Sequence, residues 1–332
     1  MKVKNLLFTK EEVGAIEIYK HEITSRRKRL LLKQRSFIEK NREVIEDYFE
    51  YPRVIQIETI ATCNAKCLMC ASAQKKMTRK TIMNNQLFEK IIYDCRELKP
   101  KMIWPFLNGE PFLDPKIFDH LDCIEKIIPG QLLGLFTNAS LLDEDKIRRL
   151  FDYNIKLLHI SINAAHKKTY EKVMGLDYGK LLKNMEFILK YNKDALIRVS
   201  FVVIDENRSE VAEFKQIWED SVGEVEIREC GNWGGELESR SKFYDKLRNK
   251  LLSIALTPKP CSWQIMNMFI LSNGDVCHCC GDTDGKFIIG DANKEILSDI
   301  WKSKLNTDLR YKHLLGTYKK EIDICRNCST VF

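Results

Sequence analysis

Two patterns of hydrophobic and polar positions alternate along most of this chain. Short apolar runs such as 157–162 and 199–204 are typical of strands that are buried on both faces. Residues 181–189 instead place apolar side chains at the spacing of an amphipathic helix. The predicted strands are 53–59, 101–107, 131–137, 156–162, 196–204 and 224–230. The predicted helices are 85–98, 116–127, 142–152, 178–192, 207–221 and 238–254.

This alternation of strand and helix predicts an α/β fold with a parallel sheet and crossover helices. Six such units are too few for a closed eight-stranded barrel, so we expect a partial (β/α)6 TIM-like barrel over residues 51–257. Catalytic residues in barrels of this kind lie at the C-terminal ends of the strands. Candidate chemistry is therefore sought in the loops that follow the strands.

The segments on either side of the barrel differ from it in character. Residues 1–50 are predicted to form a basic helical extension, because no glycine or proline interrupts the chain from Ala15 to Tyr51. Pro258 and Pro260 end the alternating pattern. The remaining residues, 258–332, are predicted to form a small cysteine-rich domain with a hairpin at 268–278.

Composition limits the class of protein. The 332 residues are 44% hydrophobic and 30% charged, which is typical of a soluble globular chain. No apolar run reaches the ~18 residues that span a membrane, and no signal peptide is recognisable at the start. We therefore expect a cytoplasmic protein without a membrane partner.

The net charge of +7 is partly local to the N-terminal extension. Between His21 and Arg42 the basic residues far outnumber Glu22 and Glu39. A solvated helix face is the favoured interpretation. Docking of an acidic electron donor such as flavodoxin or ferredoxin is the second, and nucleic acid is the least favoured partner.

Twelve cysteines in such a chain indicate metal or redox chemistry more than disulfides. Cys63, Cys67 and Cys70 form a C-x3-C-x2-C motif directly after the first predicted strand. Three thiolates can hold three corners of a [4Fe-4S] cluster and leave one iron open for a ligand. A zinc knuckle or buried structural cysteines are the alternatives, although zinc also requires four ligands.

The C-x3-C-x2-C spacing resembles the radical S-adenosylmethionine (SAM) superfamily. The resemblance implies that SAM binds the open iron and that one electron cleaves it to a 5′-deoxyadenosyl radical, which abstracts a hydrogen atom. It also implies the partial barrel. Several further segments resemble SAM-contacting motifs of that superfamily, and the implied residues are Met69, Asn108, Gly109, Glu110, Thr137, Asn138, Ser161 and Asn163.

Six of these eight residues also have a simpler interpretation. Asn108-Gly109-Glu110 resembles a G-G-E motif for the SAM ammonium group, but it can also be an ordinary turn before Pro111. Ser161 and Asn163, two apart, are expected to point the same way on a strand and to bind the ribose and methionine portion. They can equally be buried strand-end polar groups. Met69 replaces an aromatic residue that would lie against adenine, or it simply packs.

The second group of cysteines resembles the shortened SPASM, or twitch, domain of the same superfamily. Cys261, Cys279, Cys325 and Cys328 give C-x17-C-x45-C-x2-C. The resemblance implies that they hold a second, auxiliary [4Fe-4S] cluster, which is closed by four thiolates and carries electrons. Zinc is the alternative. Cys277 or Cys280 can replace Cys279 as the ligand.

Cys230 ends the sixth predicted strand and therefore lies on the expected catalytic edge. Its thiol is either a small packing group or the donor of a hydrogen atom to a substrate radical, as in radical SAM epimerases. Taken together, the sequence predicts a radical SAM oxidoreductase or epimerase acting on a sugar-like or cyclitol-like small molecule. Modification of a ribosomally made peptide, an activase or maturase of a partner protein, and a zinc-binding scaffold are the alternatives.

Overall fold

A computed structural model describes residues 49–74, 81–233, 237, 240, 241, 261–326 and 328, together with positions 32, 36, 39, 40, 43 and 45. The expected helical extension over residues 1–50 and the expected helix 238–254 lie almost entirely outside these residues. None of the helices in the described ranges has both the length and the apolar character that crossing a bilayer requires.

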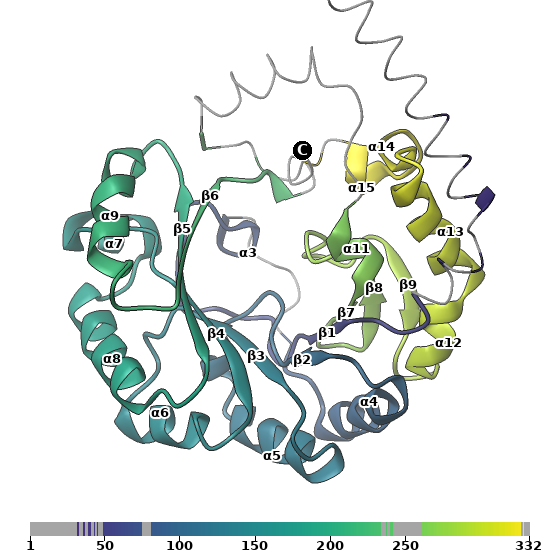
Figure 1. The fold of residues 1–332 in the computed structure, drawn as a ribbon, viewed down its shortest axis with the longest axis horizontal. Coiled ribbons are helices and arrows are strands. Elements are labelled where there is room, and N and C mark those ends of the chain that lie inside the picture. Colours follow the sequence, from purple (N-terminus) through teal and green to yellow (C-terminus); the bar gives the residue numbers. More distant parts are fainter. Residues whose placement is uncertain are drawn as a thin grey trace, which may run out of the picture.

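The described chain forms one sheet in the order β6-β5-β4-β3-β2-β1-β7-β8-β9. The first six strands pair in parallel and follow chain order, as the alternation predicted. They curve into an open ring (Figure 1). Their bounds are β1 Val54–Ile57, β2 Met102–Trp104, β3 Leu133–Thr137, β4 Ile155–Ser161, β5 Leu196–Val203 and β6 Glu224–Glu229.

The helices cover the outer face of this ring, where Figure 1 shows α4, α5, α6, α8 and α9 in succession. Ile91 and Ile92 of α4 and Leu121 of α5 are fully buried beneath them. These helices match their predicted ranges closely, except that the range 207–221 contains a 3-10 turn followed by α9. Their bounds are α4 Asn85–Leu98, α5 Ile117–Ile127, α6 Glu144–Leu150, α7 Lys167–Met174, α8 Tyr178–Tyr191, η2 Arg208–Glu210 and α9 Val211–Trp218.

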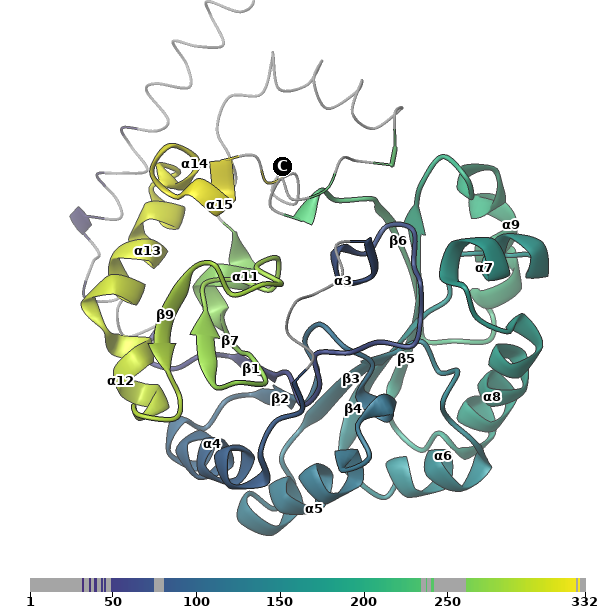
Figure 2. The ribbon, with the colours of Figure 1, turned by 180° about the vertical axis from the view of Figure 1, so that it is seen from behind.

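The structure differs from the predicted elements of the barrel at one strand and two helices. The second strand ends at Trp104 rather than at residue 107, because Pro105 has no N–H to offer the ladder. The segment that begins with Lys167 forms the helix α7, which was not among the predicted helices. The short helix α3 (Ala71–Gln74) was not predicted either and lies within the ring in two opposite views (Figures 1 and 2).

The C-terminal cysteine-rich segment continues the barrel sheet. Strand β7 (Asn267–Ile270) pairs in parallel with β1, and it forms the predicted hairpin with β8 (Asp275–Cys277). Gly274 in the hairpin turn has φ +94°, and a Cβ there would lie 2.1 Å from the Asn293 amide. The remaining elements are η1 Pro111–Leu113, α11 Ser262–Met266, β9 Ile288–Asp291, α12 Leu297–Lys302, α13 Lys304–Leu314, α14 Tyr318–Glu321 and α15 Asp323–Arg326.

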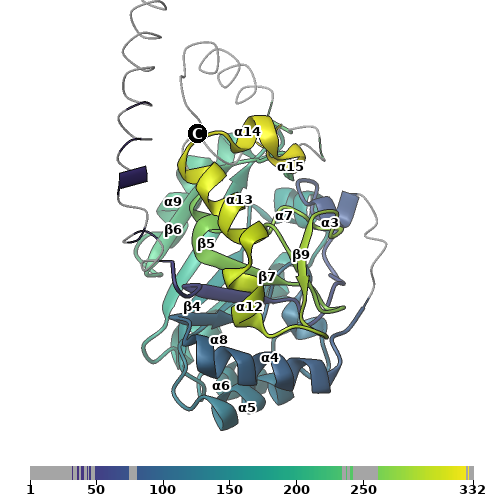
Figure 3. The same ribbon diagram turned by 90° about the vertical axis from the view of Figure 1, so that its right-hand side faces the viewer.

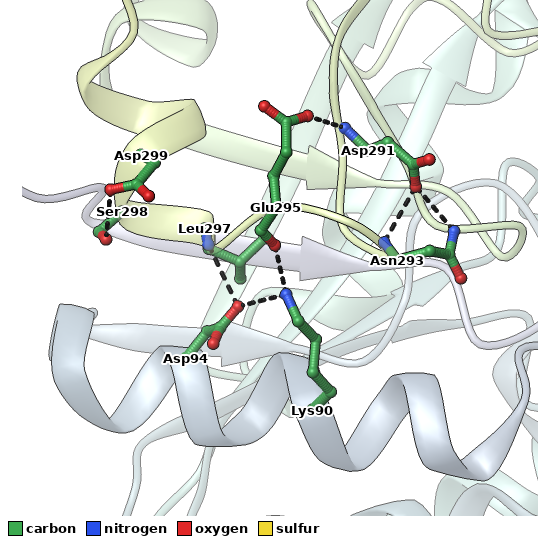
Figure 4. Close-up of polar contacts among 8 residues, drawn as sticks. All are labelled: Lys90, Asp94, Asp291, Asn293, Glu295, Leu297, Ser298 and Asp299. Carbon is green, nitrogen blue, oxygen red and sulfur yellow. Dashed lines mark hydrogen bonds and ion pairs between the residues drawn. The ribbon is translucent and has the colours of Figure 1, made fainter.

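Helix α4 fastens this segment to the barrel. Asp94 on α4 accepts a hydrogen bond from the Leu297 N–H (3.1 Å) at the start of α12 and also pairs with Lys90 (2.9 Å). Lys90 in turn donates to the Glu295 carbonyl (Figure 4). In the side view α12 lies directly above α4 (Figure 3). The C-terminal cysteines are therefore held in a fixed relation to the barrel.

Candidate functional site

The three-cysteine motif lies in a loop, residues 58–70, that follows β1; we call it the cluster loop. Its first part pairs with the segment before α4, through the Ala61 N–H and the Thr81 carbonyl (2.9 Å). Its middle part is held by the end of α7, because the Lys66 N–H donates to the Met174 carbonyl (2.9 Å). The loop is thus fixed between two distant parts of the chain.

Gly175 makes the contact between the cluster loop and α7 possible. It ends α7 in the left-handed conformation, with φ +69°, and its N–H donates to the Glu171 carbonyl. A Cβ at this position would lie 3.1 Å from the Lys66 Cβ. The glycine therefore both ends the helix and leaves room for the cluster loop.

The thiols of Cys63, Cys67 and Cys70 face one another closely enough for charge to matter. Burial raises the pKa of Cys67 well above its ordinary value, and negative charge on Cys70 and Cys63 raises it further. Desolvation likewise raises the pKa of Cys63 to about 12, although the residue as a whole is exposed. Clustered thiols that resist ionisation are stabilised as thiolates by a bound metal. These residues fit a [4Fe-4S] cluster.

Asn108, Gly109 and Glu110 pass directly against the cluster loop. A Cβ on Gly109 would lie 2.1 Å from the Ile60 carbonyl oxygen and 2.8 Å from that of Thr62. The Glu110 N–H donates to the Thr62 carbonyl (3.0 Å). No side chain fits at position 109, which explains why the predicted motif carries glycine there.

The Glu110 carboxylate is buried and connects the ends of β2 and β3. It accepts hydrogen bonds from the Thr137 hydroxyl (2.6 Å), the Asn138 N–H (2.8 Å) and the Phe112 N–H (3.3 Å). Burial raises its pKa to about 7, against the lowering effect of these bonds. The structure therefore brings Glu110, Thr137 and Asn138 together, while a contact of Glu110 with the SAM ammonium group stays a prediction.

Asn138 also reaches the cluster loop itself. Its amide donates to the Asn64 side chain (3.0 Å) and its oxygen accepts from the Ser140 hydroxyl (2.6 Å). Asn64 closes the ring by donating to the Ser140 hydroxyl (2.8 Å). The end of β3 and the cluster loop thus share one polar network, in which Asn64 and Ser140 were not predicted.

Ser161 and Asn163 do not share a strand face, so the expectation of parallel side chains was wrong. Strand β4 ends at Ser161, and Asn163 has φ +62°, which turns the chain out of the strand. The Asn163 amide oxygen accepts from the Val202 N–H (2.7 Å), and its nitrogen lies 3.1 Å from the Met174 sulfur. The predicted contact of these residues with SAM stays untested.

Two buried carboxylates hold this edge together and were missed in the sequence. Glu58 accepts from the Asn108 amide (2.8 Å) and from the N–H (3.1 Å) and hydroxyl (2.8 Å) of Ser272, so it connects β1 to the C-terminal domain. Glu210 accepts from the Ala165 N–H (2.8 Å) at the start of α7. In the sequence, the only signal for Glu58 was its position directly after an apolar strand.

Cys230 and Met69 lie at the same edge. Cys230 follows β6 directly, is 3% exposed, and its thiol donates to the Gly231 carbonyl (3.4 Å). Three residues later the Trp233 indole N–H donates to the Met69 carbonyl (2.8 Å). The loop after β6 therefore reaches the cluster loop next to Cys70, while Met69 itself is buried in the core.

The C-terminal cysteines influence one another electrostatically, and the assignment of four of them as cluster ligands stays a prediction. Burial raises the pKa of Cys280 to about 12, and nearby Cys261 and Cys328 raise it further. Burial also raises the pKa of Cys279 well above its ordinary value, with further increases from Cys280, Cys277 and Cys325. Cys279 and Cys280 thus both lie within this group. Cys277 is buried among Leu107, Phe269 and Leu271, and Cys279 and Cys280 pack against the same cluster. The donor set, made up of Cys261, Cys279 or Cys280, Cys325 and Cys328, fits a closed iron–sulfur cluster.

Comparison with known families agrees with both cysteine sites. Residues 57–216 match the family model described as the Radical SAM superfamily. Residues 261–329 match SPASM, an iron–sulfur cluster-binding domain. Together the two matches cover more than half of the chain and include both groups of cysteines.

Two curated relatives are similar to this chain over different lengths. A tungsten-containing aldehyde ferredoxin oxidoreductase cofactor-modifying protein of Pyrococcus furiosus is 26% identical over 48% of this chain and 46% of that protein. The match thus spans less than half the length of that relative. The S-adenosyl-L-methionine-dependent 2-deoxy-scyllo-inosamine dehydrogenase of Niallia circulans is 20% identical over 84% of this chain and 93% of that protein.

Solved structures confirm the predicted fold class. The crystal structure of Streptococcus suis SuiB bound to precursor peptide SuiA has a TM-score of 0.62 and 16% identity, over 83% of this chain and 70% of that chain. The parallel ring, the three-cysteine loop at its edge and the two family matches lead to one conclusion. This chain belongs to the radical SAM superfamily and is an enzyme that uses S-adenosylmethionine and a [4Fe-4S] cluster, with auxiliary iron–sulfur binding in a C-terminal SPASM domain.

Proposed function

We propose that this radical SAM enzyme oxidises or epimerises a polar, sugar-like or cyclitol-like small molecule. The observation that carries the proposal is the extent of the match with 2-deoxy-scyllo-inosamine dehydrogenase, 93% of whose length is covered. That match covers 84% of this chain, whereas the match with the cofactor-modifying protein of Pyrococcus furiosus covers 48% of it. A cytoplasmic protein with flavodoxin or ferredoxin as electron donor is part of the same proposal.

Cys63, Cys67 and Cys70 would hold the first cluster at the edge of the ring, with SAM beside it. When bound, cluster and SAM together supply an organic radical that removes a hydrogen atom from an unactivated C–H bond. The carbonyls at Asn108 and Gly109 and the carboxylate of Glu110 would accept hydrogen bonds from the SAM ammonium group. Thr137 and Asn138 hold that carboxylate in place through the bonds described above.

The product depends on what this chain does with the substrate radical. For dehydrogenation, Cys261, Cys279 or Cys280, Cys325 and Cys328 would hold the cluster that accepts the second electron. For epimerisation, the Cys230 thiol would give a hydrogen atom to the substrate carbon. The resulting Cys230 thiyl radical would then need one electron from a low-potential electron-transfer protein and one proton from solvent to become a thiol again. The place of Cys230 directly after β6 supports this second route.

Peptide or protein modification is the second candidate function. The fold similarity to SuiB with its bound precursor peptide supports it, and so does the partial match to a cofactor-modifying protein. SuiB matches over 70% of its own length, against 93% for the dehydrogenase, which favours the small-molecule proposal.

The test is turnover of 2-deoxy-scyllo-inosamine and related amino sugars in D2O by the anaerobically reconstituted enzyme. Dehydrogenation gives a product that is two hydrogens lighter and carries no solvent deuterium. Epimerisation gives a product that carries one deuterium from the exchanged Cys230 thiol. If only peptides stimulate 5′-deoxyadenosine formation, the small-molecule proposal is wrong. The variant Cys230→Ser separates the routes further, because it should leave dehydrogenation intact and stop epimerisation.

A further inference from the structure

Two buried histidines from different elements meet at the sulfur of Cys325. His278 follows β8, and His313 lies near the end of α13. Their Nε2 atoms are 3.4 Å apart and lie 3.7 Å and 3.8 Å, respectively, from the Cys325 Sγ atom. The exposed fractions are 2% for His278, 1% for His313 and 7% for Cys325. Water is therefore largely excluded from this side of the thiol.

Aromatic packing fixes the orientation of both rings. The His313 ring stacks on Tyr318 with centroids 4.1 Å apart and an interplanar angle of 17°. The His278 ring lies against Phe287 with centroids 4.9 Å apart. The Nε2 edges of the two rings are directed at each other and at the Cys325 sulfur.

The other nitrogen of each ring identifies the tautomer. Neither Nδ1 atom has a hydrogen-bond partner in the part of the chain that the structure describes. A proton on Nδ1 would therefore be an unpaired buried donor, whereas a proton on Nε2 can be donated to the Cys325 sulfur. Each neutral ring is thus most stable with its proton on Nε2.

A mononuclear metal site is the competing explanation. Zinc with Zn–N of about 2.0–2.1 Å and Zn–S of about 2.3 Å would separate tetrahedral ligand atoms by about 3.3–3.6 Å, close to the spacings here. A histidine that binds metal through Nε2, however, almost always donates its Nδ1–H to a second group. Neither ring has such a partner here. In the described ranges no fourth ligand joins His278, His313 and Cys325 at contact distance.

We propose that His278 and His313 both donate N–H···S hydrogen bonds to the Cys325 thiolate while it ligates the auxiliary cluster, and so raise the reduction potential of that cluster. Two donors on one thiolate stabilise the extra negative charge of the reduced cluster more than that of the oxidised one. The histidines are therefore positioning residues of the electron-transfer site. The inference does not depend on the identity of the substrate.

The first test is an EPR-monitored redox titration of the auxiliary cluster. The background is the Cys63→Ala, Cys67→Ala, Cys70→Ala variant, which removes the signal of the first cluster. His278→Leu and His313→Leu should each shift the potential to more negative values. His278→Gln and His313→Gln should instead keep the potential close to the wild-type value, since glutamine can offer an N–H near the place of Nε2. His120→Leu is the matched control, because His120 is also buried and stacked on Phe88 but lies elsewhere.

The second test needs no variant. In enzyme labelled with 15N-histidine, the reduced auxiliary cluster should show weak 15N hyperfine coupling, as for hydrogen-bonded imidazole. Strong coupling would mean direct ligation and would overturn the proposal. So would unchanged potentials in both leucine variants with full iron content, glutamine variants that behave like leucine, or a stoichiometric zinc ion that the histidine substitutions remove.

Discussion

The indole N–H of Trp233 donates to the backbone carbonyl of Met69 across 2.8 Å. This bond joins the loop after β6 to the cluster loop, one residue before Cys70. Trp233 has φ +49°, a conformation that is rare for a bulky residue and that persists only where the surroundings hold it. The first and last barrel strands are thus tied together where the cysteine motif lies.

We predict that Trp233→Phe weakens this tie while keeping an aromatic ring. A lost neutral hydrogen bond costs about 1 kcal/mol, which corresponds to roughly a fivefold change in an equilibrium constant. SAM should therefore bind the reconstituted enzyme more weakly, by at most about fivefold, as measured by calorimetry under anaerobic conditions. The matched control is Trp218→Phe, because the Trp218 indole nitrogen is buried without a hydrogen-bond partner in the described chain. Equal effects of the two substitutions would contradict the role of the bond to Met69.

The sequence predicted the order of the parallel strands and the place of each motif after its strand. It could do so because apolar runs and helical periodicity are local properties. It did not predict that β7 would extend the barrel sheet by pairing with β1, because that pairing joins residues more than 200 positions apart in the chain. Nor did it predict α7, whose apolar residues Tyr170, Val173 and Met174 occupy only two turns.

The candidate site was predictable where a residue type alone carries the chemistry. The two groups of cysteines, which lie within the matched families, and the glycine at 109 are of this kind, while each cysteine's role as a ligand stays a prediction. The partners of Glu58, Asn64 and Ser140 were not, since each bond depends on how loops from separate strands meet. Asn163 shows the same limit, because strand alternation stops applying once the chain adopts a positive φ after Ser161.

Replacing Cys63, Cys67 and Cys70 together by alanine should abolish SAM cleavage and remove the iron of the first cluster. The auxiliary cysteines should still bind iron, because they lie on separate elements of the C-terminal domain. Product analysis for 5′-deoxyadenosine and iron determination give the two readouts. Cys95→Ala serves as control, since Cys95 is fully buried in the core and should affect stability alone. Wild-type amounts of 5′-deoxyadenosine from the triple variant would refute the assignment of the first site.

Glu110 should make stability depend on pH in an unusual direction. Burial raises its pKa from 4.5 to about 7, so the folded state binds this proton more tightly than the unfolded state does. Its contribution to stability is thus fully present below pH 4.5 and is lost as the pH rises through about 7. Each pKa unit is worth about 1.4 kcal/mol, so the loss across this range is roughly 3 kcal/mol.

The measurement for Glu110 is urea denaturation of the cluster-free protein at several pH values, with Glu110→Gln for comparison. Glutamine does not titrate, so the stability of wild type relative to this variant should fall as the pH rises from 4.5 to about 7. Glu58→Gln is the control that tests another buried carboxylate at the same edge. A difference that stays constant with pH would show that the pKa of Glu110 is not raised.

Gly109→Ala should prevent assembly of the first cluster. The new Cβ would lie 2.1 Å from the Ile60 carbonyl oxygen, and this atom belongs to backbone that cannot rotate away. The cluster loop would have to move, which costs about 1–3 kcal/mol in a packed region and would separate Cys63 from the other two thiols. Gly179→Ala in α8 is the control, since its nearest neighbour would be a side-chain oxygen of Asp177 at 3.3 Å. Iron content and SAM cleavage should fall sharply in the first variant and stay near wild type in the second. Full iron loading of Gly109→Ala would contradict the prediction, because it would show that the cluster loop can accommodate a Cβ at position 109 despite the close contact with Ile60.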